Sequence, residues 1–187
     1  MAELKDSGQR REFDSGAVRD IQEGKGRCDL LPLSCIADWY NYLGDGYRYT
    51  PKILSCIHEF ITTRKISAIH SALCTFCIYR SWQIEDAILE VSIHYEDGAR
   101  KYGPHNWEKG IPDHCYIDSG IRHLMKYTRG DKDEPHDRAF IWNMLGLLYN
   151  ARYHEDLQDS FYPDEIESKD NTEKWLPPDP LKYNVIK

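Results

Sequence analysis

The sequence predicts an all-α protein, and three observations support that prediction. Residues 85–153 contain three stretches in which apolar side chains recur at helical spacing, about 100° per residue. Helix-ending signals follow the first two stretches, at Gly103-Pro104 and at Gly130. The apolar stretch at 66–82 carries almost no charge, which is typical of a helix in a core or at a subunit contact. The 187 residues are enough for one domain with a substantial core.

The N-terminal part of the chain is expected to be less regular. Residues 1–33 mix glycine with charged residues, and the segment is either flexible and solvated, or its Arg19, Lys25 and Arg27 reach an anionic ligand or pack onto the bundle. A short amphipathic helix is expected from Ser34 to Leu43. A further helix is expected from Thr50, as the N-cap residue, through Ile61.

Three helices are expected in the centre, followed by an irregular tail. The first ends at Gly103-Pro104, and the second runs from about Asp113 to Arg129. The third begins around Asp133 or Glu134, has Pro135 in its first turn, and continues to about Tyr153. The acidic, proline-containing residues 154–187 are expected to be irregular.

Polar side chains recur on the faces of these three helices that also carry apolar residues. At helical spacing the aligned residues are Glu90, His94, Asp97 and Lys101 on the first helix, Asp118, Arg122, Met125 and Arg129 on the second, and His136, Phe140, Asn143 and Leu147 on the third. Burying polar groups is costly unless they are paired or bind a metal. Carboxylates inside a helical bundle hold Mg²⁺ or Mn²⁺, which leave coordination positions open for phosphate oxygens. The pattern therefore predicts phosphate chemistry.

Composition excludes some classes of function. The formal net charge of −7 argues against binding to nucleic acid or to an anionic membrane. No apolar run is long enough to span a bilayer, and the N-terminus lacks the apolar core of a signal peptide. A cytoplasmic protein is therefore expected. The CxxC formed by Cys74 and Cys77 has no second metal-binding pair, so we interpret it as two buried thiols.

Two blocks of sequence carry a resemblance to a known family. They span about 15–32 and 90–148, and contain GAVRDIQEGKGRCDLLP, GARKYGPHNWEKG and RHLMKY. The chain resembles the phage dATP/dGTP diphosphohydrolase family, the MazZ-type branch of the MazG-like all-α nucleotide pyrophosphohydrolases. The resemblance implies a single MazG-like helical domain over residues 1–187, with a helical insertion at 33–89.

The resemblance also implies an activity. Such enzymes use Mg²⁺ or Mn²⁺ to cleave a purine deoxynucleoside triphosphate, dGTP or dATP, into the monophosphate and pyrophosphate. In phages that use 2,6-diaminopurine, the reaction feeds dGMP to the modified-base pathway in the host cell cytoplasm. A homodimer or homotetramer is expected.

The chain departs from the family pattern at one motif. It lacks the EExxE of MazG-like enzymes, for which Glu90 and Glu96 are the nearest equivalents beside Glu85-Asp86. The second motif, ExxD, is present from Glu134 to Asp137.

Candidate metal ligands are the carboxylates within or beside these helices: Glu90, Glu96, Asp118, Asp133, Glu134 and Asp137. Glu96 equally suits an exposed, charged helix face. Carboxylates at the start of the third helix are also favoured by the helix dipole, whatever their function.

Candidate catalytic residues are Glu90, Glu134, His123 and Lys101, with either glutamate as the base that deprotonates a water held between metal-bound carboxylates. Candidate substrate-binding residues are Lys101, Asn106, Trp107, Arg122, Lys126, His136 and Asn143. The cations suit the triphosphate, although solvated or paired surface charge is the alternative. Trp107 suits purine stacking or a place in the core, and Asn143 suits a ligand contact or a helix-to-helix hydrogen bond.

Two other functions remain open. The dyad His136-Asp137, with His123 upstream, is compatible with an HD-type phosphohydrolase, which typically releases intact triphosphate or a monophosphate. A non-catalytic helical module would instead use the apolar stretch 66–82 as its interface.

Overall fold

The computed structural model describes residues 8, 10–20, 28–32, 35–37 and 48–160. Its α-helices are α2 Tyr49–Thr63, α3 Ile66–Arg80, α4 Ile84–Tyr102, α5 Asp113–Arg129 and α6 His136–Tyr153. Short 3-10 helices occur at η1 Cys28–Leu30, η3 Asn106–Lys109 and η4 Glu155–Leu157. Strands β1 Arg10–Glu12 and β2 Val18–Asp20 form an antiparallel pair with Arg11 opposite Arg19. The all-α prediction is confirmed, with this hairpin as an addition.

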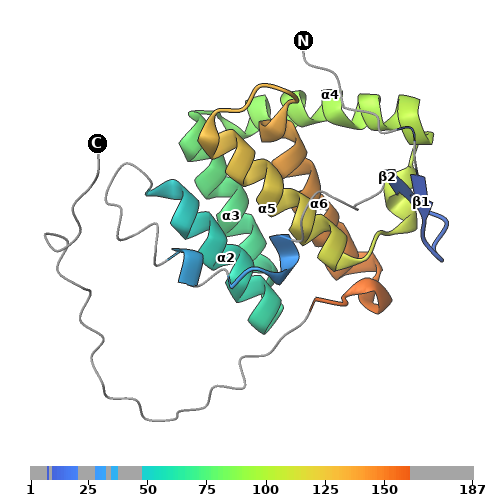
Figure 1. Cartoon of the computed structure of the whole chain (residues 1–187), viewed down its shortest axis with the longest axis horizontal. Helices are drawn as coiled ribbons and strands as arrows, with labels where there is room; N and C mark the ends of the chain where they lie inside the picture. The colour runs from blue at the N-terminus through green and yellow to red at the C-terminus, as the bar shows by residue number, and fades with distance from the viewer. Residues whose placement is uncertain (1–7, 9, 21–27, 33–34, 38–47, 161–187) are drawn as a thin grey trace, which may run out of the picture.

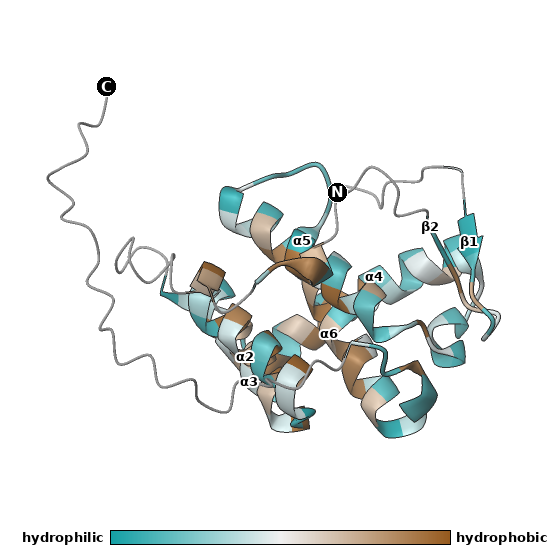
Figure 2. Ribbon diagram, turned by 60° about the horizontal axis from the view of Figure 1, so that its bottom comes forward, coloured by the Kyte–Doolittle hydropathy of each residue, from teal (hydrophilic) through white to brown (hydrophobic). Residues whose placement is uncertain are grey.

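The helices form a bundle around α5 and α6. These two helices lie side by side, α2 and α3 pack on one flank, and α4 crosses one end (Figure 1). Apolar ribbon segments gather on α5 and α6, whereas much of α4 is hydrophilic (Figure 2). The largest fully buried side chains come from α2, α3, α5, α6 and the loop before α5: Tyr116, Phe60, Phe76, Phe140, Ile53, Leu54, Ile57, Ile69, Ile111, Ile117, Ile121 and Leu124.

The predicted helix ends are mostly confirmed, with one correction at α6. The helix α4 ends directly before Gly103, and α5 has the predicted bounds. The helix α6 begins at His136, so Asp133 and Glu134 precede it and Pro135 is its N-cap residue. A residue followed by proline is disfavoured in the α-helical region, which explains why the helix starts only after Pro135.

Three further expectations change upstream. The helix α2 begins at Tyr49, and the Thr50 hydroxyl bonds to Thr128 rather than capping its helix. Cys74 is exposed and Cys77 is only partly buried, so the prediction of two buried thiols is wrong. The expected Ser34–Leu43 helix and most of the tail lie largely outside the described residues.

The hairpin is fixed to the helical body by hydrogen bonds. Asn106 pairs with the backbone of Val18 at both its N–H and its carbonyl, at 3.0 and 3.1 Å. The Ser15 hydroxyl donates to the Gly110 carbonyl at 2.6 Å. These contacts place β2 against the end of α4.

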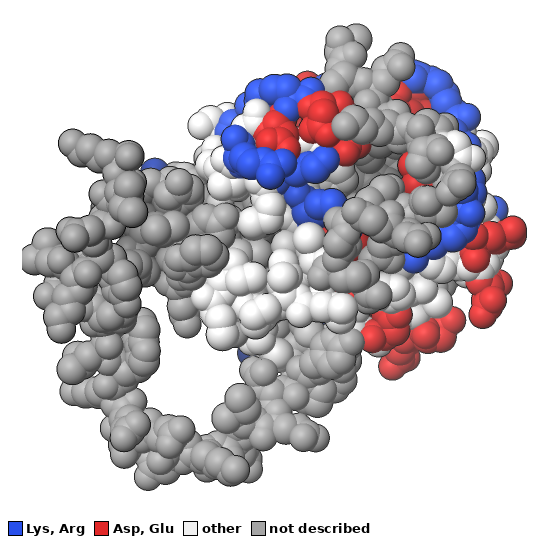
Figure 3. All heavy atoms as spheres, in the orientation of Figure 1, with Lys and Arg blue, Asp and Glu red and all other residues white. Residues whose placement is uncertain are grey.

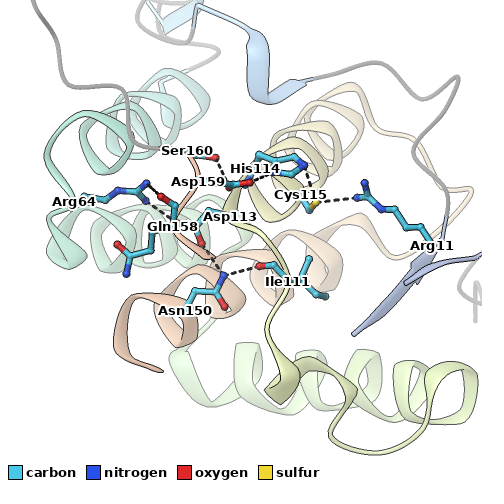
Figure 4. A network of polar contacts seen from close by, with 10 residues as sticks. All are labelled: Arg11, Arg64, Ile111, Asp113, His114, Cys115, Asn150, Gln158, Asp159 and Ser160. Atoms are coloured by element: carbon cyan, nitrogen blue, oxygen red, sulfur yellow. Dashed lines mark hydrogen bonds and ion pairs between the residues drawn. The ribbon is translucent and has the colours of Figure 1, made fainter. Parts of the chain in front are cut away.

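A second network joins the start of α5 to the end of α6 (Figure 4). The buried Asp113 carboxylate accepts from Arg64 Nη1 at 2.8 Å and from Asn150 Nδ2 at 2.9 Å. His114 Nδ1 lies 2.5 Å from Asp159 Oδ2, and its Nε2 lies 3.2 Å from Cys115 Sγ. The Asp159 contact, followed by the Cys115 contact, raises the pKa of His114 to about 10, so this imidazole is charged at neutral pH.

Asp113 gives a testable pH dependence. Burial raises the pKa of Asp113 from 3.8 to about 6. Between these values the folded state binds more protons than the unfolded state, so the contribution of Asp113 to stability falls as pH rises, by about 3 kcal/mol in total. Urea unfolding of the wild type and Asp113→Asn from pH 4 to 7 measures this, because the variant cannot titrate. A stability difference between the two that does not change with pH would contradict the assignment.

Positive and negative side chains interleave on one face of the molecule (Figure 3). None of the helices in the described part of the chain combines the length and apolar character needed to cross a membrane.

Candidate functional site

A cluster of histidines and acids lies where α5, the following loop and the start of α6 meet. We call it the histidine–acid cluster, and its members are His123, Asp131, Asp133, Glu134 and His136. Two groups within it are compact: in each of His123–Glu134–His136 and Asp131–Asp133–His136, one potential ligand atom per residue lies within 4.8 Å of the others. The short loop turns the chain sharply, which brings α6 back beside α5.

The hydrogen bonds of the cluster orient both imidazoles. His136 Nε2 lies 2.8 Å from Asp133 Oδ1, and since a carboxylate only accepts, this nitrogen carries the proton. His136 Nδ1 is then an acceptor, 2.9 Å from His123 Nδ1, which donates to it. Burial, which disfavours the charged form, holds the pKa of His123 well below its usual range, so this ring is neutral at neutral pH. Neutral imidazoles are the form that binds metals.

The donor set fits a divalent transition metal. Two imidazole nitrogens and a carboxylate suit Mn²⁺, Fe²⁺, Co²⁺ or Zn²⁺, whereas Mg²⁺ prefers oxygen ligands alone. The carboxylate of Asp133 on the outer nitrogen of His136 is the arrangement that orients metal-binding histidines in proteins. His123 and His136 were predicted as a catalytic and a substrate-binding residue, and their place in the cluster makes both candidates for metal ligation as well.

Lys126 on α5 borders the cluster. Its Nζ lies 3.2 Å from Asp133 Oδ2 and 3.7 Å from Glu134 Oε1. This cation was predicted to bind substrate, and it sits where it can also meet phosphate oxygens.

The structure brings together two of the six predicted carboxylate ligands, Asp133 and Glu134. The other four, Glu90, Glu96, Asp118 and Asp137, belong to neither group of potential ligands found among the described residues. Each is instead paired with an arginine: Glu90 with Arg138, Glu96 with Arg100, Asp118 with Arg122, and Asp137 with Arg80. Glu96 is 63% exposed, as the alternative interpretation of this residue required. Arg122 was predicted to bind the triphosphate, and in this structure it pairs with Asp118.

Two other predicted substrate residues have structural partners. Lys101 Nζ binds Asp20 Oδ2 at 2.8 Å, and both polar atoms of the Asn106 side chain bind the backbone of Val18. Their assignment to substrate remains a prediction, but the structure shows both fixing the hairpin.

An open aromatic cavity of about 270 Å³ lies between the end of α4, η3 and α6. Trp107, Tyr95 and Trp142 form part of its lining, and the Trp107 ring packs edge-on against Tyr95 at 5.5 Å. This volume is near the lower end for ligand pockets, about 300 Å³. Trp107 was predicted to stack on a purine, and its place in this cavity is compatible with that role.

Packing of Arg19 onto the bundle was one of the alternatives that the sequence left open, but its contacts around Trp142 were not predicted. The Arg19 guanidinium lies over the rings of Trp142 and Tyr116, and its Nη2 donates to Asn143 Oδ1 at 3.1 Å. The buried His94 ring lies 5.9 Å from the Trp142 ring. The signal was present in the charged N-terminal motif, but nothing in the local sequence separates a solvated arginine from one that enters the bundle.

Comparison with known proteins identifies part of the chain. Residues 79–160 match the family described as dATP/dGTP diphosphohydrolase, N-terminal. No curated protein and no solved structure matches the chain. The matched segment contains the whole histidine–acid cluster and all of α4, α5 and α6. Residues 79–160, somewhat less than half of the 187-residue chain, are therefore similar to the N-terminal part of the dATP/dGTP diphosphohydrolase family.

Proposed function

We propose that the protein hydrolyses dATP and dGTP to the monophosphate and pyrophosphate, with a divalent metal ion bound at the histidine–acid cluster. The observation that carries the proposal is the convergence of His123, Glu134 and His136 inside the segment that matches the family. Release of dGMP would suit the predicted place in a phage 2,6-diaminopurine pathway.

The residues of the cluster have separable roles in this proposal. A bound metal ion polarises phosphate oxygens and makes a water easier to deprotonate. Asp133 orients His136 through its outer nitrogen. Lys126 lies beside the carboxylates and offsets negative charge as pyrophosphate leaves. Glu134 is the better candidate for the base, because Glu90 Oε2 accepts hydrogen bonds from Arg138 at 2.7 Å.

The donor set favours Mn²⁺ over Mg²⁺, the two ions predicted from the sequence. Imidazole nitrogen binds Mn²⁺ more readily than Mg²⁺, which takes oxygen ligands. Metal-stripped protein should therefore regain more activity, and at lower ion concentration, with Mn²⁺ than with Mg²⁺.

One experiment tests the reaction. The chelator-treated protein is incubated with each of the eight nucleoside triphosphates and with Mn²⁺ or Mg²⁺, and the products are separated by chromatography. We expect dGMP or dAMP together with pyrophosphate, in equal amounts. Inorganic triphosphate as the product would favour the HD-type alternative, and no product with any nucleotide would favour a non-catalytic module.

The HD-type alternative has partial support from geometry. His123 and His136 do meet, but Asp137 Oδ2 accepts from Arg80 Nε at 3.1 Å and lies outside both groups of potential ligands in the described part of the chain. His136 and Asp137, although adjacent in the sequence, therefore make separate sets of contacts.

A further inference from the structure

Arg19 is held in place by its two neighbours on β2. The backbone of Val18 is bound on both sides by Asn106, and the Asp20 carboxylate binds Lys101 Nζ. Because successive side chains on a strand point to opposite sides, fixing Val18 and Asp20 also fixes the direction of Arg19. Its side chain reaches the facing sides of α5 and α6.

The Arg19 guanidinium has few polar partners for its five N–H groups. It lies 5.5 Å from the Tyr116 ring centroid and 5.4 Å from that of Trp142. Nη2 donates to Asn143 Oδ1, while the buried Nη1 has no hydrogen-bond partner. Burial lowers the pKa of Arg19, yet a guanidinium stays charged in proteins. No carboxylate among the described residues pairs with it.

Other arginines of the bundle differ in this respect. Three that are largely shielded from solvent each pair with a carboxylate: Arg64 with Asp113, Arg122 with Asp118, and Arg138 with Glu90. Withdrawing a cation from water without a counter-charge is costly. Arg19 therefore has the environment of a group whose anion comes from outside the described protein, and it remains partly exposed.

His94 is a second buried group without a partner for one of its nitrogens, and it lies beside the same Trp142 ring. It is buried, its ring lies 5.9 Å from that of Trp142, and its Nδ1 has no hydrogen-bond partner. Burial, then the charges of Arg138 and Arg19, lowers the pKa of His94 to about 4, so the ring is neutral and can donate one N–H.

We propose that Arg19 is a substrate-binding residue that holds a phosphate group of the nucleotide, with His94 beside it. That this phosphate belongs to a nucleotide rests on the proposed function. Parallel N–H groups of a guanidinium match two phosphate oxygens. Trp142 contacts Arg19 and also lines the aromatic cavity, so Arg19 and the cavity share this indole. Arg19 lies outside residues 79–160, so the N-terminal hairpin completes the site of the matched segment.

Calorimetric titration of the full chain with inorganic pyrophosphate, with Mn²⁺ present, tests the proposal. Arg19→Gln should raise the Kd for pyrophosphate about ten-fold or more, since charge-assisted hydrogen bonds are lost. Arg10→Gln is the matched control, because it removes the same charge from the partner strand, where Arg10 pairs with Asp20 at 3.0 Å. This control should stay within about two-fold of the wild type, as expected for an ion pair that retains some exposure, 28% at Arg10 and 17% at Asp20.

A purely structural role for Arg19 predicts a different result. Arg19→Gln disturbs the partner of Asn143 Oδ1, which by itself can destabilise the core. The double variant Arg19→Met, Asn143→Leu removes both polar partners together and should fold without an orphaned acceptor. If Arg19 binds phosphate, the double variant also loses pyrophosphate affinity. Wild-type affinity in the folded double variant would overturn the proposal, as would wild-type protein that binds no pyrophosphate.

The outcomes for binding and for reaction are separable. Pyrophosphate binding that depends on Arg19, in a protein that hydrolyses no nucleotide, would overturn the proposed reaction and leave this inference standing. Hydrolysis of dGTP with an unchanged KM in Arg19→Gln would support the proposed reaction and overturn the inference about Arg19.

Discussion

Glu134→Gln is expected to lower kcat for dGTP hydrolysis about 100-fold or more, the largest effect on activity that we anticipate. The change keeps the size of the side chain but removes the negative charge that a metal ligand or a general base requires. Glu134 is the carboxylate that completes the group formed with His123 and His136. Steady-state kinetics with dGTP and Mn²⁺ measure the effect.

A matched control separates this effect from the loss of a surface ion pair. Glu59 lies 3.5 Å from Lys65, much as Glu134 lies 3.7 Å from Lys126, but it is exposed on α2. Glu59→Gln should change kcat by less than about two-fold, because an exposed pair contributes little. Equal loss in both variants, or none in Glu134→Gln, would remove the histidine–acid cluster from the reaction. Weaker Mn²⁺ binding by Glu134→Gln in a calorimetric titration would identify the role as ligation.

Gly146→Ala is expected to cause the largest loss of stability, about 1–3 kcal/mol or more. Gly146 lies on α6 where that helix meets α5, and an added Cβ would stand 2.2 to 2.6 Å from three ring atoms of Tyr116. The Tyr116 ring is fully buried and packs against Trp142, so it has little room to move. Urea unfolding followed by circular dichroism measures the change.

Gly98→Ala is the control for this substitution. Gly98 lies inside α4, where an added Cβ meets nothing within 4 Å. Alanine at an unhindered helical position is more stable than glycine by about 0.5–1 kcal/mol. The two glycine replacements should therefore change stability in opposite directions. A stable Gly146→Ala protein would mean that α5 and α6 do not approach as closely as described.

Gly103-Pro104, Gly130 and Pro135 show how much of the fold local sequence specifies. Gly103 and Gly130 adopt positive φ at the ends of α4 and α5, as helix-ending glycines do. Pro135 fixes the start of α6 at His136, two or three positions later than the predicted start at Asp133 or Glu134. The hairpin was not predicted, because its two strands are three residues each and depend on contacts with Asn106 and Gly110.

The carboxylates were the least predictable part of the site. Periodicity placed Glu90, Asp118 and Asp137 on helix faces that carry buried residues, and an acid there suits a metal or an arginine equally well. The structure provides an arginine for each. Those arginines include Arg80 and Arg138, whose distance in space from the acids depends on how the helices pack.

By itself, the sequence determined the all-α class and the ends of α4 and α5, because glycine, proline and apolar spacing act over a few residues. Only the tertiary structure decided which polar groups meet. His123 and His136 face each other, and Arg19 reaches Asn143 from 124 residues away, because packing sets the rotation of each helix about its axis. No short-range pattern encodes that rotation, so the members of the histidine–acid cluster could be grouped only from the packed helices.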